Sequence, residues 1–220
     1  MRRGVLTLLA VAALGFASVA TADDIVKPAW RGNDGSTLQV WEFDAPGEPV
    51  DFEGNTWHTY EQPTTDENPF GTAVLRHYPG YGQPDWIDEW AGREGVLPLS
   101  GAVRIEIPND PTPNPQKDVW IQITWLPQYP DADICAEVLE MENFTVFEAE
   151  EVMTVFLENG WMHTAFNIHI EPNPTDEVVW IQCGVLIDEI VVDTLCFVPE
   201  PASLALLSIG GLAALLRRKR

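Results

Sequence analysis

Apolar and polar residues alternate with a period of two along several short runs of this 220-residue chain. Val103, Ile105 and Ile107 fall on one side of such a run, and charged residues separate them. Residues 162–170 repeat the pattern in their second half. Side chains of a strand point alternately to its two faces, so this pattern is typical of a half-buried antiparallel strand. No long segment has the 3.6-residue period of an amphipathic helix.

Runs rich in valine, isoleucine, threonine and aromatic residues are separated by proline, glycine, asparagine and aspartate, which favours strands joined by turns. We expect nine strands, at Leu38–Phe43, Ala73–His77, Val103–Ile107, Val119–Leu126, Phe144–Phe147, Val152–Leu157, Met162–Ile170, Val178–Leu186 and Glu189–Phe197. This number and spacing predict an all-β fold, an antiparallel β-sandwich or jelly roll. Residues 45–71 and 78–101 are irregular, and they predict either loops or short strands that the pattern does not place.

One stretch of sequence occurs twice, 59 to 60 residues apart. Residues 113–122 read PNPQKDVWIQ, and residues 172–182 read PNPTDEVVWIQ. An alternating run ending in isoleucine precedes each copy, so each unit reads as strand, proline-rich turn and strand. We expect two equivalent hairpins in one pseudo-symmetric sandwich, because half of the chain alone would bury too small a core.

The pleat of each repeated strand sorts its side chains between two faces. Trp120 and Gln122 share a face in the first copy, and Trp180 and Gln182 share one in the second. A sugar ring can stack on an indole while its hydroxyls bond to a neighbouring amide. The chain is loosely similar in architecture to jelly-roll carbohydrate-binding modules, but it has no motif specific to them. The alternative is that both tryptophans fill the core between the sheets, since tryptophan is usually buried.

Two further aromatic clusters lie in the irregular part of the chain. Trp86 and Trp90 are four residues apart with acidic residues between them, and Trp57 begins an aromatic run. Loops often carry binding residues. These side chains therefore predict either an aromatic binding cleft or anchors that fix the loops to the sandwich.

The first 22 residues have the three-part pattern of a secretory signal peptide. Two arginines precede an apolar stretch, residues 5–20, and small residues at Ala20 and Ala22 offer two cleavage sites. We expect cleavage after Ala20 or Ala22, and we place one β-sandwich domain at residues 23–198.

The last residues combine a short motif, an apolar run and a basic end. Pro199, Glu200 and Pro201 precede fifteen uncharged residues, 202–216. The chain then ends with four basic residues: Arg217, Arg218, Lys219 and Arg220. A helix over residues 202–216 would be about 22 Å long, which is short for a hydrocarbon core of ~30 Å. We expect a marginal transmembrane helix whose basic end acts as a cytoplasmic stop.

This order of triplet, apolar run and basic end resembles the PEP-CTERM sorting signal. The resemblance implies that an exosortase-type membrane protease or transpeptidase recognises residues 199–220 and cuts near the Pro-Glu-Pro triplet. It also implies transient anchoring in the inner membrane, followed by a place in the cell envelope or outside the cell. The alternatives are an ordinary single-pass tail anchor and a buried core helix, which the basic end disfavours.

The charge of the chain excludes one class of partner. The sequence has 12 basic and 34 acidic residues, and six of the basic ones lie in the two terminal segments. Removal of residues 1–22 and 202–220 leaves six basic against 34 acidic residues, a formal net charge of −28. Such a surface repels phosphates, so we expect no nucleic acid partner.

Candidate catalytic chemistry is sparse. The sequence contains no HExxH motif, no phosphate-binding glycine loop and no serine nucleophile motif. Four histidines lack metal-ligand spacing, and the pairing of the three cysteines stays open. The chain predicts no cofactor other than a possible calcium ion, for which Asp85, Asp88 and Glu89 offer oxygen ligands.

Two functions fit these features. The first is a non-catalytic protein of the cell envelope or extracellular matrix that an exosortase-type enzyme processes. The second is a carbohydrate-binding module that holds extracellular polysaccharide with its tryptophan faces. A glycan-active hydrolase with two loop carboxylates is a third, weaker hypothesis.

Overall fold

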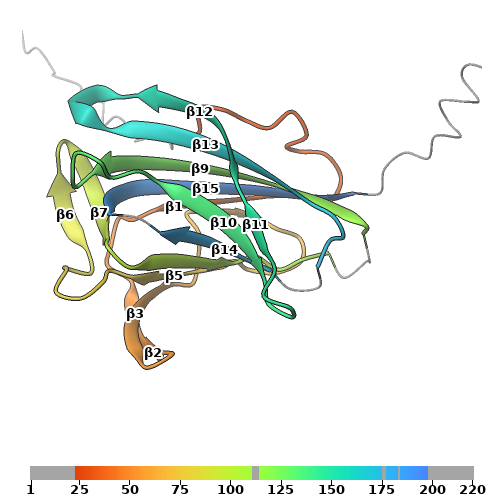
Figure 1. Cartoon of the computed structure of the whole chain (residues 1–220), viewed down its shortest axis with the longest axis horizontal. Coiled ribbons are helices and arrows are strands. Elements are labelled where there is room, and N and C mark those ends of the chain that lie inside the picture. Colours follow the sequence, from red (N-terminus) through yellow and green to blue (C-terminus); the bar gives the residue numbers. More distant parts are fainter. Residues whose placement is uncertain (1–22, 111–113, 175–176, 183, 198–220) are drawn as a thin grey trace, which may run out of the picture.

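Two antiparallel β-sheets lie face to face in the computed structural model, which describes residues 23–110, 114–174, 177–182 and 184–197 (Figure 1). Sheet A has the strand order β12 (Glu150–Phe156), β13 (Met162–Ile170), β9 (Gln116–Pro127), β15 (Val185–Phe197), β1 (Ser36–Glu42) and β4 (Thr65–Glu67). The hairpin of β6 (Ile87–Trp90) and β7 (Arg93–Leu99) joins sheet A where β7 pairs with β15.

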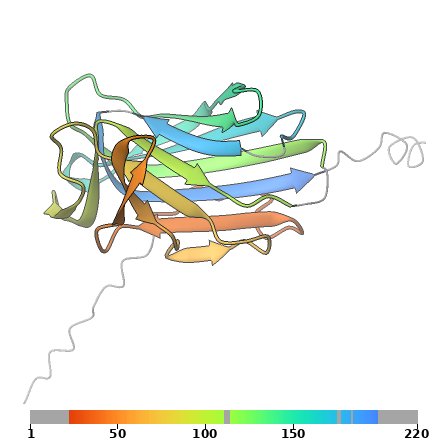
Figure 2. The ribbon, with the colours of Figure 1, turned by 90° about the horizontal axis from the view of Figure 1, so that it is seen from below.

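Sheet B has the strand order β11 (Val146–Glu148), β10 (Cys135–Glu140), β14 (Glu177–Gln182), β8 (Ala102–Glu106), β5 (Val74–Tyr78), β3 (Asn55–Tyr60) and β2 (Glu48–Phe52). The β2–β3 hairpin projects from the lower part of Figure 1, and Figure 2 shows the two layers from below. A 3₁₀ turn at Glu158–Gly160 connects β12 to β13.

The core lies between the inner faces of the two sheets. Ile121 and Ile123 of β9 and Ile187 of β15 are fully buried there, opposite Ile105 of β8 and Ile181 of β14. The period-two alternation predicts the inner face of the strand at Val103–Ile107, whereas for the two repeated strands only the structure decides which face enters the core. The prediction of an all-β antiparallel sandwich is therefore confirmed, and the jelly-roll variant stays a prediction.

Most expected strands are present, although several bounds differ. Met162–Ile170 matches β13 in full, whereas the predicted strand at Phe144–Phe147 begins only at Val146. Phe144 has a positive φ of 55° and is 71 % exposed, so it belongs to the preceding turn. The irregular regions hold β2, β3, β4, β6 and β7, and β10 was not predicted at all.

The expected turn between Leu186 and Glu189 is wrong. β15 runs through this position from Val185, and its register with β9 shifts between Ile187 and Glu189, as at a β-bulge. Partners from distant parts of the chain allow the acidic residues Asp188 and Glu189 to lie within the strand.

The expected pair of hairpins is also wrong. β8 lies in sheet B and β9 in sheet A, while β13 lies in sheet A and β14 in sheet B. Each proline-rich turn therefore carries the chain from one sheet to the other, because proline cannot donate to a strand ladder. The two turns meet where the amide of Asn173 donates to the carbonyl of Pro115 at 3.0 Å.

The terminal predictions fall on residues that the structure does not describe. Within the described ranges, no helix is long and apolar enough to cross a membrane. The predicted signal peptide at residues 1–22 and the predicted helix at residues 202–216 lie outside those ranges.

Candidate functional site

The two repeated Trp-Gln pairs lie on the outer faces of opposite sheets. Trp120 and Gln122 are on the outer face of β9, since their neighbours Ile121 and Ile123 enter the core. Trp180 and Gln182 are on the outer face of β14 in the same way. Neither tryptophan fills the space between the sheets, so the alternative interpretation as core residues is wrong.

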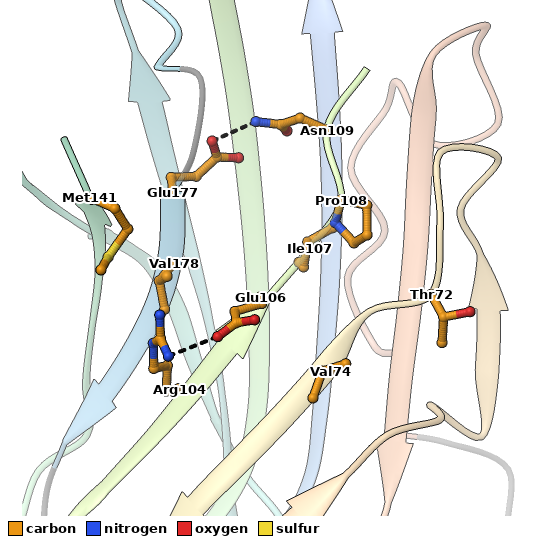
Figure 3. Close-up of a pocket in the computed structure, with 10 residues that line it drawn as sticks. All are labelled: Thr72, Val74, Arg104, Glu106, Ile107, Pro108, Asn109, Met141, Glu177 and Val178. Carbon is orange, nitrogen blue, oxygen red and sulfur yellow. Dashed lines mark hydrogen bonds and ion pairs between the residues drawn. The ribbon is translucent and has the colours of Figure 1, made fainter. Parts of the chain in front are cut away.

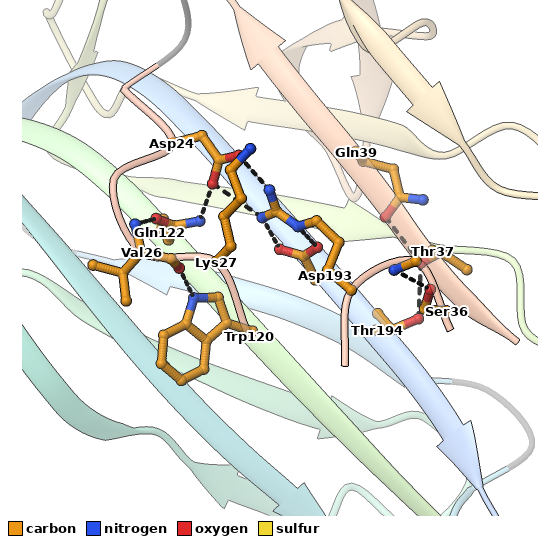
Figure 4. Close-up of polar contacts among 12 residues, drawn as sticks. Asp24, Val26, Lys27, Ser36, Thr37, Gln39, Trp120, Gln122, Asp193 and Thr194 are labelled. Atoms are coloured by element: carbon orange, nitrogen blue, oxygen red, sulfur yellow. Dashed lines mark hydrogen bonds and ion pairs between the residues drawn. The ribbon is translucent and has the colours of Figure 1, made fainter. Parts of the chain in front are cut away.

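The N-terminal segment, residues 23–35, covers the Trp120 face. Val26 accepts a hydrogen bond from Trp120 Nε1 at 2.9 Å and donates its amide to Gln122 Oε1 at 2.9 Å. Gln122 Nε2 donates to Asp24 at 2.8 Å, and its side chain is fully buried (Figure 4). Both side chains therefore hold the N-terminal segment against sheet A.

Arg31 is the ionic centre of this contact. Its guanidinium bonds to Asp24 of the same segment and to the fully buried Asp193 of β15. Burial raises the pKa of Asp193 to about 6, although Arg31 opposes the shift. Burial would also raise the pKa of Asp24, but hydrogen bonds from Arg31 and Gln122 lower it below its usual value. These charges are matched within the protein and form no open site.

The outer face of sheet B carries a cluster of rings that we call the aromatic platform: Phe52, Trp57, Tyr78 and Trp180. The Trp57 ring centroid lies 6.0 Å from that of Trp180, 5.6 Å from that of Tyr78 and 5.5 Å from that of Phe52. The Arg104 guanidinium lies 4.9 Å from the Phe52 centroid, within cation–π range. The platform joins strands β2, β3, β5 and β14 and leaves Trp180 partly exposed.

The outer face of sheet B has two hollows, and one of them borders Trp180. A small groove is lined by Trp180, the exposed Gln182 and Glu137 of the neighbouring strand β10. A pocket of about 440 Å³ lies further along the same face, where Arg104 pairs with Glu106 at 2.8 Å (Figure 3). Ten residues line this pocket: Thr72, Val74, Arg104, Glu106, Ile107, Pro108, Asn109, Met141, Glu177 and Val178. This mixture of apolar walls and charged groups suits a polar ligand better than an apolar one.

Glu177, which lines the pocket, belongs to a buried ion pair. Lys117 of β9 is 1 % exposed, and its ammonium bonds to Glu177 and Asn109. Glu177 also accepts a hydrogen bond from the Asn109 amide at 2.6 Å. The pair fixes the first residue of β14 against sheet A, and sequence reasoning did not find it because the two residues are 60 positions apart.

The other predicted tryptophans occupy different settings. Trp86 donates its Nε1–H to the carbonyl of Phe43 at 2.7 Å and packs against the core, which is the expected anchor. Trp90 is 50 % exposed at the end of β6. It borders a second pocket, between the β6–β7 hairpin and the start of β15, of about 320 Å³. The structure does not bring Trp86 and Trp90 to the aromatic platform.

The predicted calcium ligands and the carboxylates that converge in space are different residues. Asp85 lies 3.4 Å from His58, and Asp88 and Glu89 are exposed on β6. Within the described residues, the three carboxylates with oxygens inside 4.8 Å of one another belong to Asp23, Asp188 and Glu189. Calcium at Asp85, Asp88 and Glu89 stays a prediction.

Comparison with known proteins identifies the tail. Residues 197–220 match the PEP-CTERM protein-sorting motif. This match contains the predicted triplet and basic end, and it implies an exported protein that an exosortase processes. No curated protein matches the chain.

Solved structures similar to the folded body include a carbohydrate-binding module. This module is CBM6cm-2 of Cellvibrio mixtus lichenase 5A, in complex with cellotriose. The two share 10 % sequence identity and a TM-score of 0.28, over 70 % of this chain and 94 % of the module. A likeness at this level carries no functional argument.

Proposed function

We propose that this chain is an exported, non-catalytic protein of the cell envelope or extracellular matrix, released or attached by an exosortase-type enzyme. The PEP-CTERM motif at residues 197–220 is the observation that carries the proposal. The acidic body and the signal-peptide pattern at residues 1–22 agree with work outside the cytoplasm.

The physical properties of the tail explain how such a protein is handled. An apolar run of fifteen residues, 202–216, partitions into lipid but spans it barely, because a helix rises only about 1.5 Å per residue. The basic end resists translocation and holds the tail in the inner membrane. The enzyme then cuts near Pro199–Pro201 while the sandwich lies outside.

Intact-mass measurement of the protein isolated from the native envelope tests this proposal. We expect a mature chain that lacks Ala202–Arg220 as well as the signal peptide. Envelope material that still contains Arg217–Arg220 would contradict it. The same measurement in a strain without exosortase is the control, and there the tail should be retained.

We propose as a second function that the outer face of sheet B binds extracellular polysaccharide. Trp180 is the specific observation in favour, because its ring is partly exposed beside an exposed amide, Gln182, and beside the Arg104–Glu106 pair. An aromatic ring with neighbouring hydrogen-bonding groups is the usual composition of a sugar subsite. The protein would then hold matrix polymer without changing it.

The two tryptophans provide a matched test of glycan binding. In pull-down with envelope polysaccharide, Trp180→Ala should weaken binding about tenfold or more, as loss of a stacking aromatic does at binding hot spots. Trp120→Ala, the same change on the covered face, should keep wild-type binding but lower the melting temperature. Equal binding by both variants and the wild type, with circular dichroism showing intact folds, would exclude this face.

A further inference from the structure

Glu189 of β15 is a buried carboxylate with an incomplete set of partners. Its side chain is 4 % exposed, on the outer face of sheet A under the N-terminal segment. Oε2 accepts a hydrogen bond from the backbone nitrogen of Asp23 at 2.6 Å. Oε1 is buried and has no partner among the described residues. Burial of a carboxylate oxygen without a hydrogen-bond donor costs free energy. This environment of Glu189 therefore needs one more donor.

Among the described residues, Glu189 also has no cation in ion-pair contact. The Asp23 carboxylate and Asp188 converge on it, and Glu42 of β1 adds a third acidic neighbour. Arg93 of β7 is the nearby cation, but it bonds to Asp23 at 2.6 Å and to Asp188 at 2.9 Å. Burial first, and then the charges of these acidic groups, raise the pKa of Glu189 to about 8.

The N-terminal segment is held firmly enough to define where the nitrogen of Asp23 lies. The side chain of Asp23 pairs with Arg93, and the next residue, Asp24, pairs with Arg31 and accepts from Gln122. Arg93 lies on β7 and Gln122 on β9, and these two strands pair with β15 from opposite sides. The backbone nitrogen of Asp23 is therefore fixed against the buried carboxylate.

We propose that the missing group is the α-ammonium of Asp23, created when signal peptidase cuts between Ala22 and Asp23. The peptide nitrogen carries one hydrogen and no charge, whereas an ammonium carries three hydrogens and a positive charge. It would keep the bond to Glu189 Oε2 and supply the donor and the charge that Oε1 lacks. The inference rests on the export proposed above.

This geometry decides between two cleavage sites that the sequence leaves equal. Ala20 and Ala22 both end a small-x-small pattern. Only a cut after Ala22 places the new charge on the atom 2.6 Å from Glu189. A cut after Ala20 leaves Asp23 with a neutral peptide nitrogen. Removal of the signal peptide thus releases the protein and also creates the partner of Glu189 in the folded state.

The chain cut after Ala22 and the chain cut after Ala20 should respond oppositely, in stability, to neutralisation of Glu189. With a neutral nitrogen at Asp23, the raised pKa means that the folded state holds a proton between pH 4.5 and about 8 that the unfolded chain has lost. Stability then falls as pH rises through this window, and Glu189→Gln removes the loss. With an ammonium at Asp23, Glu189 is ionised and paired, so the same substitution leaves a buried ammonium unpaired.

The titratable groups that face this place come from every neighbouring element. They are Asp23 and Asp24 of the N-terminal segment, Glu42 of β1, Arg93 of β7, His163 of β13 and Asp188 of β15. Their covalent structure is the same in both forms, because cleavage alters only the nitrogen of Asp23. A comparison of the two forms therefore cancels their contributions.

The experiment uses the full chain, exported by a host with a signal peptidase. Mass spectrometry of the exported protein should show Asp23 as its first residue. Ala22→Leu should block this site and give a second protein that begins at Thr21. At pH 8, Glu189→Gln should lower the melting temperature of the Asp23 form by several degrees and leave that of the Thr21 form unchanged or raised.

A chemical readout works even if a variant folds poorly. Acylation of the N-terminal amine of the Asp23 form by an amine-reactive ester at pH 8 should be several-fold slower than in its Glu189→Gln variant. In the Thr21 form the substitution should not change this rate. Slower acylation that depends on Glu189 only in the Asp23 form would support the ion pair directly.

Four results would overturn the inference. The first is a wild-type exported protein that begins at Thr21. The second is an equal change in melting temperature on Glu189→Gln in both forms. A rise in melting temperature with calcium that Glu189→Gln abolishes would assign the carboxylates to a metal instead. Precursor that keeps Met1 inside the cell would overturn the export proposal together with this one, whereas the first three results leave export intact.

Discussion

At the scale of single residues, the same sequence context has produced two different roles. Trp120 and Trp180 each precede an Ile-Gln pair and each point outward from a sheet. The N-terminal segment covers Trp120, whereas Trp180 remains partly exposed on the aromatic platform. A covering segment, and not the residue itself, therefore separates an anchor from a candidate binding group.

His77 of β5 shows how a buried residue sets a pH limit. It is fully buried, and its Nε2–H donates to the carbonyl of Pro98 at 2.8 Å. Burial lowers its pKa to about 4. Between about pH 6.5 and 4, His77 is protonated in the unfolded chain but stays neutral in the folded chain. The free energy of unfolding should therefore fall by up to about 3 kcal/mol as pH decreases through this window.

Urea unfolding at several pH values checks this prediction. Asp188 and Asp193 have raised pKa values and act in the opposite direction on acidification, so the wild-type profile alone is a mixture. The informative quantity is the difference in unfolding free energy between wild type and His77→Gln, which keeps a donor for Pro98. A difference that stays constant from pH 7 to pH 4 would contradict the prediction.

At the scale of elements, two tight hairpins escaped the sequence analysis. Glu53-Gly54 joins β2 to β3 and Ala91-Gly92 joins β6 to β7, and all four residues have positive φ. Such two-residue hairpin turns are usually predicted from an Asn-Gly or Asp-Gly dipeptide, because these residues adopt positive φ readily. Glutamate and alanine at the first position do not give that signal, so the strands on either side were taken as irregular.

Gly95 in β7 is the position where an element depends most on glycine. Its φ is 69°, and an added Cβ would lie 2.0 Å from the carbonyl oxygen of Phe43. Gly95→Ala should lower the free energy of unfolding by at least about 2 kcal/mol, because the backbone at Phe43 must move and the alanine must adopt a strained positive φ. Gly54→Ala is the matched control, since its φ is 77° but no atom lies within 4 Å. Urea denaturation showing equal losses would contradict this.

β15 is a buried apolar strand that contains acidic residues. Asp188, Glu189 and Asp193 interrupt a run of buried apolar residues, and all three are buried. Arg93, Asp23 and Arg31 supply partners from elsewhere in the chain. A local pattern cannot reveal such partners, which is why the strand was broken at this place in the prediction.

At the scale of the whole molecule, the proposed export depends on the two ends of the chain. If the triplet is read by its glutamate, Glu200→Ala should leave unprocessed protein in the inner membrane. Fractionation followed by intact-mass measurement would show a retained chain that includes Arg217–Arg220. A Glu200→Ala protein cut and released like the wild type would show that the enzyme ignores this side chain.

The sequence by itself determined the strand-rich class, the apolar face of strands such as Val103–Ile107 and the sorting tail. These features are local: the period of two belongs to one strand, and the tail is a continuous motif. The tertiary structure alone decided which sheet each repeated strand joins and which outer face is covered. It also decided that charged residues lie within β15, because the contact of Asp23 with Glu189 joins residues 166 positions apart and leaves no trace in either neighbourhood.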